Sequence, residues 1–201
     1  IVELSGATEH VSFCGKIKNP VDLLLISPCT ANTISKIAHG IDDTVVTTFA
    51  TTAIGSGVPL IIVPAMHLSM YDHKIVQENI KICKGLKINF IGPKIEKNKA
   101  KFADIDEIVA NVIRIFGKKD LKEKRILIIG GPTSESVDDV RMITNKSSGK
   151  TAVNIVKKAF FRGADVEFWY GDGREPSPKY IKTLHFNSNN DISKLIEEND
   201  V

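Results

Sequence analysis

VDLLLIS, residues 21–27, is a nearly continuous apolar run of the kind found in strands buried on both faces of a parallel sheet. A second such run follows at Pro59–Val63. Between them, Asn32–Ala38 and Thr44–Ala53 carry apolar residues at helical spacing. This alternation of strands and helices predicts an α/β layered fold.

The alternation continues along the chain and is interrupted once. A helix is predicted at 71–84, a strand at 88–91 and a helix at 105–116, before the short charged stretch Gly117–Lys124. A second α/β unit follows, with strands at 125–129, 165–170 and 181–186, a loop at 130–148, and helices at 149–162 and from Ile192. Gly163 stands where a helix end needs a left-handed residue. Charged stretches often separate compact units, so the boundary is predicted there.

Composition favours a globular protein that acts on small molecules. The chain has 201 residues, 42% of them hydrophobic, and a net charge of only +3 from 27 basic and 24 acidic residues. No basic footprint for nucleic acid is apparent, and no apolar run approaches the roughly 20 residues of a membrane span. Because the chain starts at Ile1 and stops within a predicted helix, it is expected to be a fragment.

The three cysteines, Cys14, Cys29 and Cys83, are odd in number and lack C-x-x-C spacing. This pattern argues against a disulfide framework or a metal site, and it fits a reducing, cytoplasmic setting.

Polar and small residues follow both apolar runs of the first unit. Ser27–Thr33 (SPCTANT) and Pro64–Tyr71 (PAMHLSMY) come directly after strands, and loops at the carboxyl ends of parallel strands converge on one edge. Free amides at a helix start suit a phosphate or a polar ring edge. The plainer interpretations are that Thr30 or Asn32 only caps a helix, and that the second loop fills the core and exposes His67.

The loop of the second unit combines small residues with positive charge. Gly130–Glu135 (GGPTSE) and Asp138–Lys150 (DDVRMITNKSSGK) lie between a strand and a helix. Small residues let the backbone approach a phosphate, so phosphate binding is favoured over a bare loop. A Walker A motif is absent because Thr144 stands where its first glycine belongs, and Gly-x-Gly-x-x-Gly is absent too, which disfavours NAD.

The first unit resembles the flavoprotein family of cysteine decarboxylases, which includes phosphopantothenoylcysteine decarboxylase. The resemblance covers about residues 9–116 and rests on Pro28-x-Thr-Ala-Asn-Thr-x-x-Lys-x-Ala-x-Gly-x-x-Asp43, Pro64-Ala-Met66 and Met70-Tyr71. It implies a flavodoxin-like fold that binds FMN. The residues expected to contact FMN are Thr30, Ala31, Asn32, Thr33, Ala65 and Met66.

The resemblance also implies a chemistry and its residues. His10 falls where the family has its catalytic histidine. Flavin would oxidise the cysteinyl thiol, the thioaldehyde would lose carbon dioxide, and the ene-thiol would then be reduced. His67 replaces an asparagine that holds the substrate carboxylate, and an imidazole can still donate that hydrogen bond. The expected flap, Gly92–Lys101, lacks the family's cysteine, which leaves the reduction step open.

The second unit resembles phosphopantothenate–cysteine ligase, in which Gly-Pro-Thr, Asp-x-Val-Arg-x-Ile-x-Asn and Ser-Ser-Gly-Lys recur in this order. The resemblance implies a Rossmann-like domain that activates 4′-phosphopantothenate with CTP and Mg²⁺ before cysteine displaces CMP. Asn145 would hold the activated acyl group, and Arg141 and Lys150 would bind substrate. The expected nucleotide-binding residues are Gly131, Thr133, Ser147, Ser148 and Gly149.

Together these resemblances predict a flavin-binding decarboxylase part at 1–117, a linker at 118–124 and a ligase part at 125–201, both parts incomplete. The expected partners are 4′-phosphopantothenate, cysteine, CTP and phosphopantothenoylcysteine, with trimeric decarboxylase units and dimeric ligase units. Two alternatives stay open, a non-catalytic flavoprotein or regulatory binding subunit, and a peptidyl-cysteine decarboxylase. The latter leaves residues 125–150 unexplained.

Overall fold

The computed structural model describes residues 9–16, 20–96 and 99–199. The chain divides into two compact units, Ile1–Ile108 and Val109–Val201. The division falls inside helix α6, Ile105–Phe116. Each unit is described by itself.

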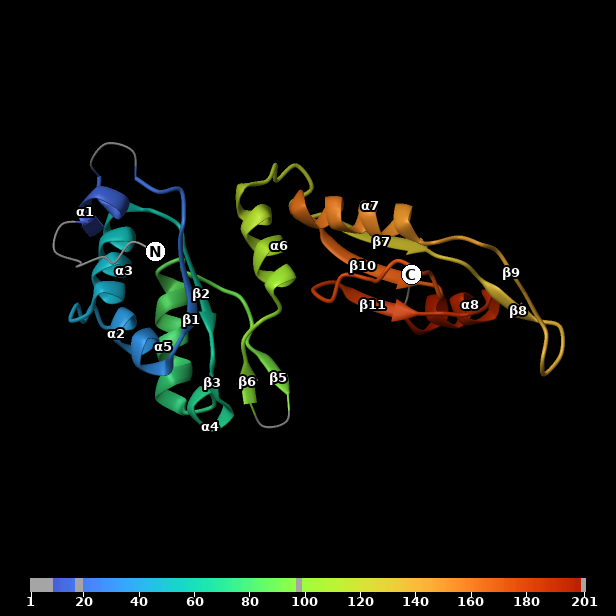
Figure 1. The fold of residues 1–201 in the computed structure, drawn as a ribbon, viewed down its shortest axis with the longest axis horizontal. Coiled ribbons are helices and arrows are strands. Elements are labelled where there is room, and N and C mark those ends of the chain that lie inside the picture. The colour runs from blue at the N-terminus through green and yellow to red at the C-terminus, as the bar shows by residue number, and fades with distance from the viewer. Residues whose placement is uncertain (1–8, 17–19, 97–98, 200–201) are drawn as a thin grey trace. The chain divides into compact units, whose positions relative to one another are not determined.

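A three-stranded parallel sheet forms the centre of the first unit (Figure 1). Its strands are β1 (Leu24–Cys29), β2 (Leu60–Pro64) and β4 (Asn89–Phe90), in the order β1-β2-β4. Every residue of β2 is buried, as expected for a central parallel strand. The register of β1 on β2 shifts between Ile26 and Cys29, and this irregularity accommodates Pro28, which has no N–H for the ladder.

Helices α2 (Ala31–Ala38), α3 (Val45–Ser56) and α5 (Lys74–Gly85) contribute to a core with β1 and β2. The core residues include Ile34, Ala50, Ile62, Ile80 and Cys83. Helix α3 begins with a capping box at Thr44 and ends at Gly57, whose φ of 79° is left-handed.

Short elements follow the carboxyl end of β2. Strand β3 (Met66–His67) leads into the one-turn helix α4 (Leu68–Tyr71). Strand β3 pairs antiparallel with β6 (Lys99–Lys101), which pairs with β5 (Lys94–Glu96). The segment predicted to be a flap is therefore a β-hairpin joined to β3.

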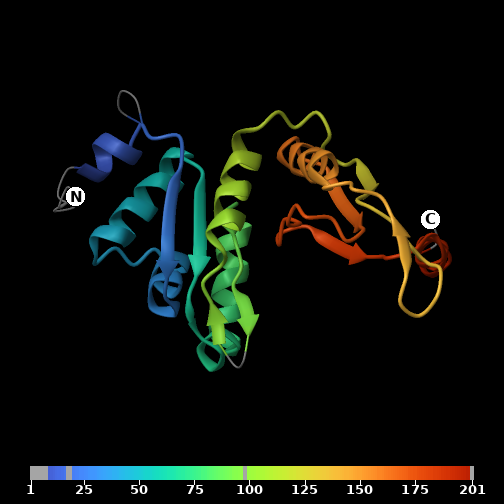
Figure 2. The ribbon, with the colours of Figure 1, turned by 45° about the vertical axis from the view of Figure 1, so that its right-hand side comes forward.

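The second unit has its own three-stranded parallel sheet, in the order β11-β10-β7. The strands are β7 (Arg125–Gly130), β10 (Asp165–Tyr170) and β11 (Lys182–His185), and helix α7 (Lys150–Phe161) buries Val153 and Val156 against one face. An antiparallel ribbon of β8 (Ser134–Ser136) and β9 (Met142–Thr144) extends from this unit, and α8 (Asn189–Glu198) ends it (Figure 2).

The structure confirms the α/β class with parallel sheets, and it corrects several boundaries. Strand β1 starts at Leu24, not Val21, and it continues through Pro28 and Cys29, which were expected to follow the strand. The predicted loop 130–148 contains the β8–β9 ribbon. Helix α8 begins before Ile192 because Ser188 forms a capping box with Asp191. Gly163 does adopt a positive φ, 96°, after α7.

The charged stretch 117–124 is tied to the second unit. Asp120 forms a two-pronged ion pair with Arg162, with Arg162 Nε 2.9 Å from Asp120 Oδ1. Leu121 packs against the core of the unit, and its N–H donates to the carbonyl of Arg162. These contacts order a segment whose composition resembles a solvated linker.

Candidate functional site

Two chain segments meet where the parallel strands of the first sheet have their carboxyl ends, a region here called the carboxyl edge. Cys29 at the end of β1 pairs with Pro64 at the end of β2. The N–H of Ala65 donates to the carbonyl of Cys29 at 2.9 Å, which fastens the start of one loop to the start of the other. The parallel sheet thus brings the predicted Thr30–Thr33 and Ala65–His67 segments to one edge.

Thr30 organises this edge by capping α2. Its side-chain oxygen accepts from the N–H of Thr33 at 3.4 Å and lies 3.3 Å from the Thr33 hydroxyl. Ala31 is buried, whereas Thr30 and Asn32 are exposed. The edge therefore offers hydroxyl, amide and helix-start N–H groups beside small side chains. This donor set fits the polar edge of a flavin ring.

His67 stands where the hairpin meets this edge. It ends β3, pairs through its backbone with Lys99, and caps α4. Its Nδ1 accepts from the N–H of Ser69 at 3.3 Å and lies 2.8 Å from the Ser69 hydroxyl. The exposed imidazole is thereby held in place by its own chain. Met66, one residue earlier, is half-buried and packs against the core.

The structure does not bring His10 to this edge within one chain. His10 lies on α1 (Glu9–Cys14), with Nδ1 2.8 Å from the Thr52 hydroxyl on α3 and its ring edge-on to Phe49. Cys14 on the same helix packs with Leu24 and Val58, which adjoin the amino ends of β1 and β2. Helix α1 therefore lies toward the end of the sheet opposite the edge (Figure 1).

None of the three cysteines has the properties of a reactive thiol. All are buried. Burial raises the pKa of Cys29 to about 12, with a further contribution from Cys83, and burial raises the pKa of Cys83 to about 11. Burial also raises the pKa of Cys14. Such thiols are poor substitutes for the cysteine that the hairpin lacks.

In the second unit a cavity of about 310 Å³ lies beside the start of α7. It brings together five of the residues predicted from the ligase-like motif, namely Gly131, Ser147, Ser148, Gly149 and Lys150. The remainder of the lining comes from β7 and from α7 itself. A helix start, small side chains and one lysine provide a setting suited to a phosphate.

Close packing explains the glycines around this cavity. Gly149 has a φ of 76°, and a Cβ there would lie 2.0 Å from the Tyr170 hydroxyl. A Cβ on Gly131, whose φ is 95°, would lie 2.9 Å from the N of Gly171. Only glycine fits either position, so the backbone path and the surrounding packing require both residues.

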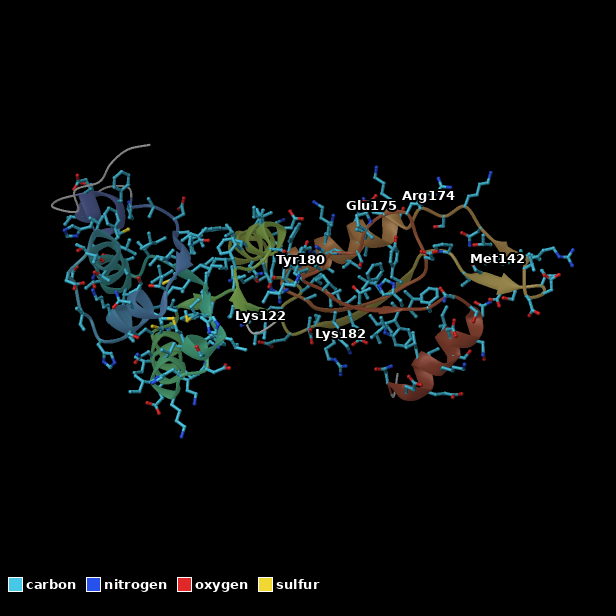
Figure 3. All side chains as sticks on the ribbon, turned by 60° about the horizontal axis from the view of Figure 1, so that its bottom comes forward. Lys122, Met142, Arg174, Glu175, Tyr180 and Lys182 are labelled. Carbon is cyan, nitrogen blue, oxygen red and sulfur yellow. The ribbon has the colours of Figure 1, made fainter. Side chains whose placement is uncertain are left out.

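Tyr170 is not part of the cavity lining, but it packs against Gly149 and reaches the Ser148 carbonyl, and the motif did not indicate it. Its hydroxyl donates to the carbonyl of Glu175 at 2.7 Å and lies 3.3 Å from that of Ser148. Burial raises the pKa of Tyr170. Figure 3 shows Glu175 beside α7, where its N–H donates to the Ser148 carbonyl at 2.9 Å. An aromatic residue at the carboxyl end of a strand was the one sequence signal for it.

Three predicted ligase residues lie outside the cavity lining. Asn145 accepts from the N–H of Ser147 at 2.9 Å, which holds the turn into α7. Arg141 is on the ribbon, which carries the labelled Met142 in Figure 3, and its guanidinium lowers the pKa of the exposed Asp138 carboxyl. Thr133 accepts through its carbonyl from the Thr144 hydroxyl at 2.8 Å.

Neither a metal cluster nor a membrane span is found in the part of the chain that the structure describes. Residues 9–16, 20–96 and 99–199 contain no group of three or more His, Cys, Asp or Glu side chains placed to hold a metal ion. No helix formed by these residues is both long and apolar enough to cross a bilayer.

Comparison with known proteins gives matches along most of the chain. The flavoprotein family model matches residues 3–117, and the model of the DNA/pantothenate metabolism flavoprotein C-terminal domain matches residues 121–200. The coenzyme A biosynthesis bifunctional protein CoaBC of Thermococcus kodakarensis is 53% identical over 83% of this chain, and that of Methanocaldococcus jannaschii is 42% identical over 90%. The matched regions are 41% and 43% of those proteins, so the chain spans less than half of their length.

Among solved structures, a PPC decarboxylase mutant complexed with pantothenoylaminoethenethiol is 28% identical, with a TM-score of 0.44. The match covers 50% of this chain and 63% of that one. The flavoprotein family model, by contrast, matches more than half of the 201 residues. The chain belongs to the flavoprotein family.

Proposed function

We propose that this chain serves two steps of coenzyme A biosynthesis. In the first step, 4′-phosphopantothenate is activated by CTP and joined to cysteine. In the second, the resulting phosphopantothenoylcysteine is decarboxylated to 4′-phosphopantetheine with FMN. The observation that carries the proposal is the match of the two units, in order, to the two family models, together with bifunctional relatives that are 53% and 42% identical over 83% and 90% of this chain.

The decarboxylase role is assigned to the carboxyl edge of the first sheet. Bound FMN would supply the two-electron oxidation and reduction of the substrate sulfur and carbon. In this proposal Thr30, Asn32 and Thr33 hydrogen-bond the flavin ring edge, and Ala31, Ala65 and Met66 pack against it. His67 binds the substrate carboxylate. The exposed hydroxyl and amide groups at this edge support these roles.

His10 is proposed as the catalytic base of a neighbouring copy. Its position over α3, away from the carboxyl edge, gives it no access to an edge site in its own chain. An assembly in which the first units meet, such as the expected trimer, would supply His10 from one copy to the edge of the next. The contact with Thr52 orients the imidazole.

The ligase role is assigned to the cavity beside α7, in a Rossmann-like domain. Gly131, Ser147, Ser148 and Gly149 are proposed to receive the CTP phosphates, with Mg²⁺ carried in by the nucleotide. Thr133 also binds the nucleotide, Lys150 and Arg141 bind the substrate, and Asn145 holds the acyl group. The gathering of five motif residues around 310 Å³ supports this assignment.

The ribbon that carries Arg141 supports the expected dimer of ligase units. Val137, Val140, Met142 and Ile143 are all exposed, and Val140 has 89% of its surface open. Apolar side chains exposed together on a projecting ribbon are suited to contact with a second copy.

A non-catalytic flavin-binding protein is the second candidate. The observation that favours it is the hairpin without a cysteine, together with the buried, high-pKa thiols elsewhere. This candidate predicts bound flavin without turnover of phosphopantothenoylcysteine.

The experiment uses the protein extended to the full length of its relatives. Bound yellow flavin and CMP release that requires both cysteine and 4′-phosphopantothenate are expected. Asn145→Ala should stop ligation after nucleotide transfer, so the acyl-cytidylate should accumulate. Flavin binding without CMP release would contradict the ligase step. The absence of both bound flavin and CMP release would contradict the whole proposal.

A further inference from the structure

Tyr170, the last residue of β10, joins two segments beside the cavity of the second unit. Its side chain is buried, and its hydroxyl donates to the Glu175 carbonyl at 2.7 Å. The N–H of Glu175 in turn donates to the Ser148 carbonyl at 2.9 Å, and the Tyr170 hydroxyl lies 3.3 Å from that same carbonyl. These contacts, here called the Tyr170 clamp, tie the loop 171–175 to the chain that enters α7.

A glycine on each segment lets the clamp close around the phenol. A Cβ on Gly149 would collide with the Tyr170 hydroxyl, and so would a Cβ on Gly173, which would also lie 3.0 Å from the Ser148 carbonyl oxygen. The phenol therefore fills the space between the two backbones. Burial raises the pKa of Tyr170, so its hydroxyl stays protonated and continues to donate.

The clamp decides which way one peptide of the cavity wall faces. The Ser148–Gly149 peptide is trans and planar, so its C=O and its N–H point in opposite directions. Because the carbonyl points toward the clamp, the Gly149 N–H points away from it. That N–H donates to the hydroxyl of Ser147, another residue of the cavity lining, across 3.4 Å. So long a contact is weak, and a phosphate oxygen can take its place.

We infer that Tyr170 is a positioning residue of the proposed ligase, which acts through the Ser148–Gly149 peptide so that the Gly149 N–H faces the cavity as a donor to a nucleotide phosphate oxygen. If this peptide turned over, it would present a carbonyl oxygen, which repels an anion. Tyr170 lies outside the cavity lining, so it acts through the backbone and not by contact with the nucleotide. This role rests on the proposed function in one respect, namely that the cavity receives the phosphates of CTP.

Tyr170→Phe keeps the ring and removes only the hydroxyl that closes the clamp. In the full-length protein it should raise the KM for CTP by about three- to tenfold, the loss expected for one neutral hydrogen bond. The KM for cysteine should be unchanged, because cysteine reacts only after the nucleotide has been transferred. A general loss of structure in the second unit would change both constants. Equal rises in the two KM values, or an unchanged KM for CTP, would overturn the positioning role.

Two control variants separate the clamp from other effects. Tyr180→Phe is the matched control, because Tyr180 packs against the same core cluster as Tyr170 but lies outside the clamp. It should leave the KM for CTP unchanged, and a rise equal to that in Y170F would overturn the role. Glu175→Gln keeps the backbone N–H and C=O that form the clamp and removes a negative charge, so it should not weaken CTP binding. A raised KM for CTP in E175Q would show that the Glu175 side chain, and not the clamp, serves the nucleotide.

Gly173→Ala tests the clamp from its other side. The φ of Gly173 is not left-handed, so the expected effect comes from the collision of the new Cβ with the Tyr170 hydroxyl. G173A should also raise the KM for CTP. Because both changes disrupt one clamp, the double variant with Y170F should raise KM no further than the larger single change. Single effects that multiply in the double variant would contradict a shared clamp.

The clamp itself can be followed in this chain without any nucleotide. Hydrogen exchange of the Glu175 amide, measured by NMR, should be slow in the wild type and about three- to tenfold faster in Y170F. An unprotected Glu175 amide in the wild type, or equal exchange in the two proteins, would refute the clamp. A wild-type full-length protein that releases no CMP would refute the proposed ligase step and the positioning role together, while the exchange rates would still decide whether the clamp forms.

Discussion

Substitution of Gly149 by alanine should destabilise the second unit through two separable effects. The first is the left-handed backbone, with φ at 76°, which costs a residue with a Cβ about 1–2 kcal/mol. The second is a collision, because the new Cβ would lie 2.0 Å from the Tyr170 hydroxyl and 2.6 Å from its ring carbons. Overpacking of this kind costs about 1–3 kcal/mol, so the expected total is about 2–5 kcal/mol.

Gly163→Ala is the matched control for the backbone effect. Gly163 also has a positive φ, 96°, but the nearest atom to its added Cβ is the N of Lys122 at 3.5 Å, an ordinary contact. Its expected cost is therefore only about 1–2 kcal/mol. The difference between the two variants measures the collision with Tyr170.

Urea unfolding followed by tryptophan fluorescence is the assay. Trp169 is the only tryptophan of the chain and is fully buried in β10, so its emission reports on the second unit alone. With a urea dependence of about 1–3 kcal/mol per M, G149A should lower the midpoint by roughly 1 M or more. Equal midpoints for G149A and G163A would refute the packing argument.

Three further predictions concern the assembly, the thiols and the end of α7. Mixed His10→Asn and Asn32→Leu proteins, each inactive alone, should regain roughly a quarter of the decarboxylase activity if the site joins two copies, and no recovery would contradict that arrangement. Because its pKa is raised to about 12, the Cys29 thiol stays protonated in the folded chain at pH values where the same thiol ionises in the unfolded chain. The free energy of unfolding should therefore fall above about pH 9, by up to about 1.4 kcal/mol per pH unit. Cys29→Ala should flatten this fall in denaturation curves, and an unchanged slope would count against it. Arg114→Met removes donors to three carbonyl oxygens around the end of α7 and should lower the free energy of unfolding by about 2–4 kcal/mol. Loss of the exposed Arg162–Asp120 pair should lower it by less than about 1 kcal/mol, and equal losses in the two variants would refute this prediction.

Patterns that depend on continuous burial were predictable from sequence. The run Leu60–Pro64 is buried at every residue, and such runs indicate central parallel strands. The edge at Cys29 and Pro64 followed from that, because parallel strands align their carboxyl ends. The motif at Ser147–Lys150 predicted phosphate binding at a helix start, and the structure has a cavity at that place.

Features set by long-range packing were not predictable. Strands β8 and β9 have mostly exposed residues, so no alternation of apolar and polar positions marked them. The place of His10 depends on the packing of α1 against α3, for which one sequence offers no local signal. The link from Tyr170 to Ser148 joins residues 22 positions apart. Such contacts arise only when the sheet has formed.

The decisive measurement for the two-step function is mass spectrometry of 4′-phosphopantothenate incubated with cysteine, CTP and the flavin-loaded full-length protein. We predict conversion to 4′-phosphopantetheine, with phosphopantothenoylcysteine accumulating instead in His10→Asn. Recovery of unchanged 4′-phosphopantothenate from the wild-type protein would rule out the proposed two-step function.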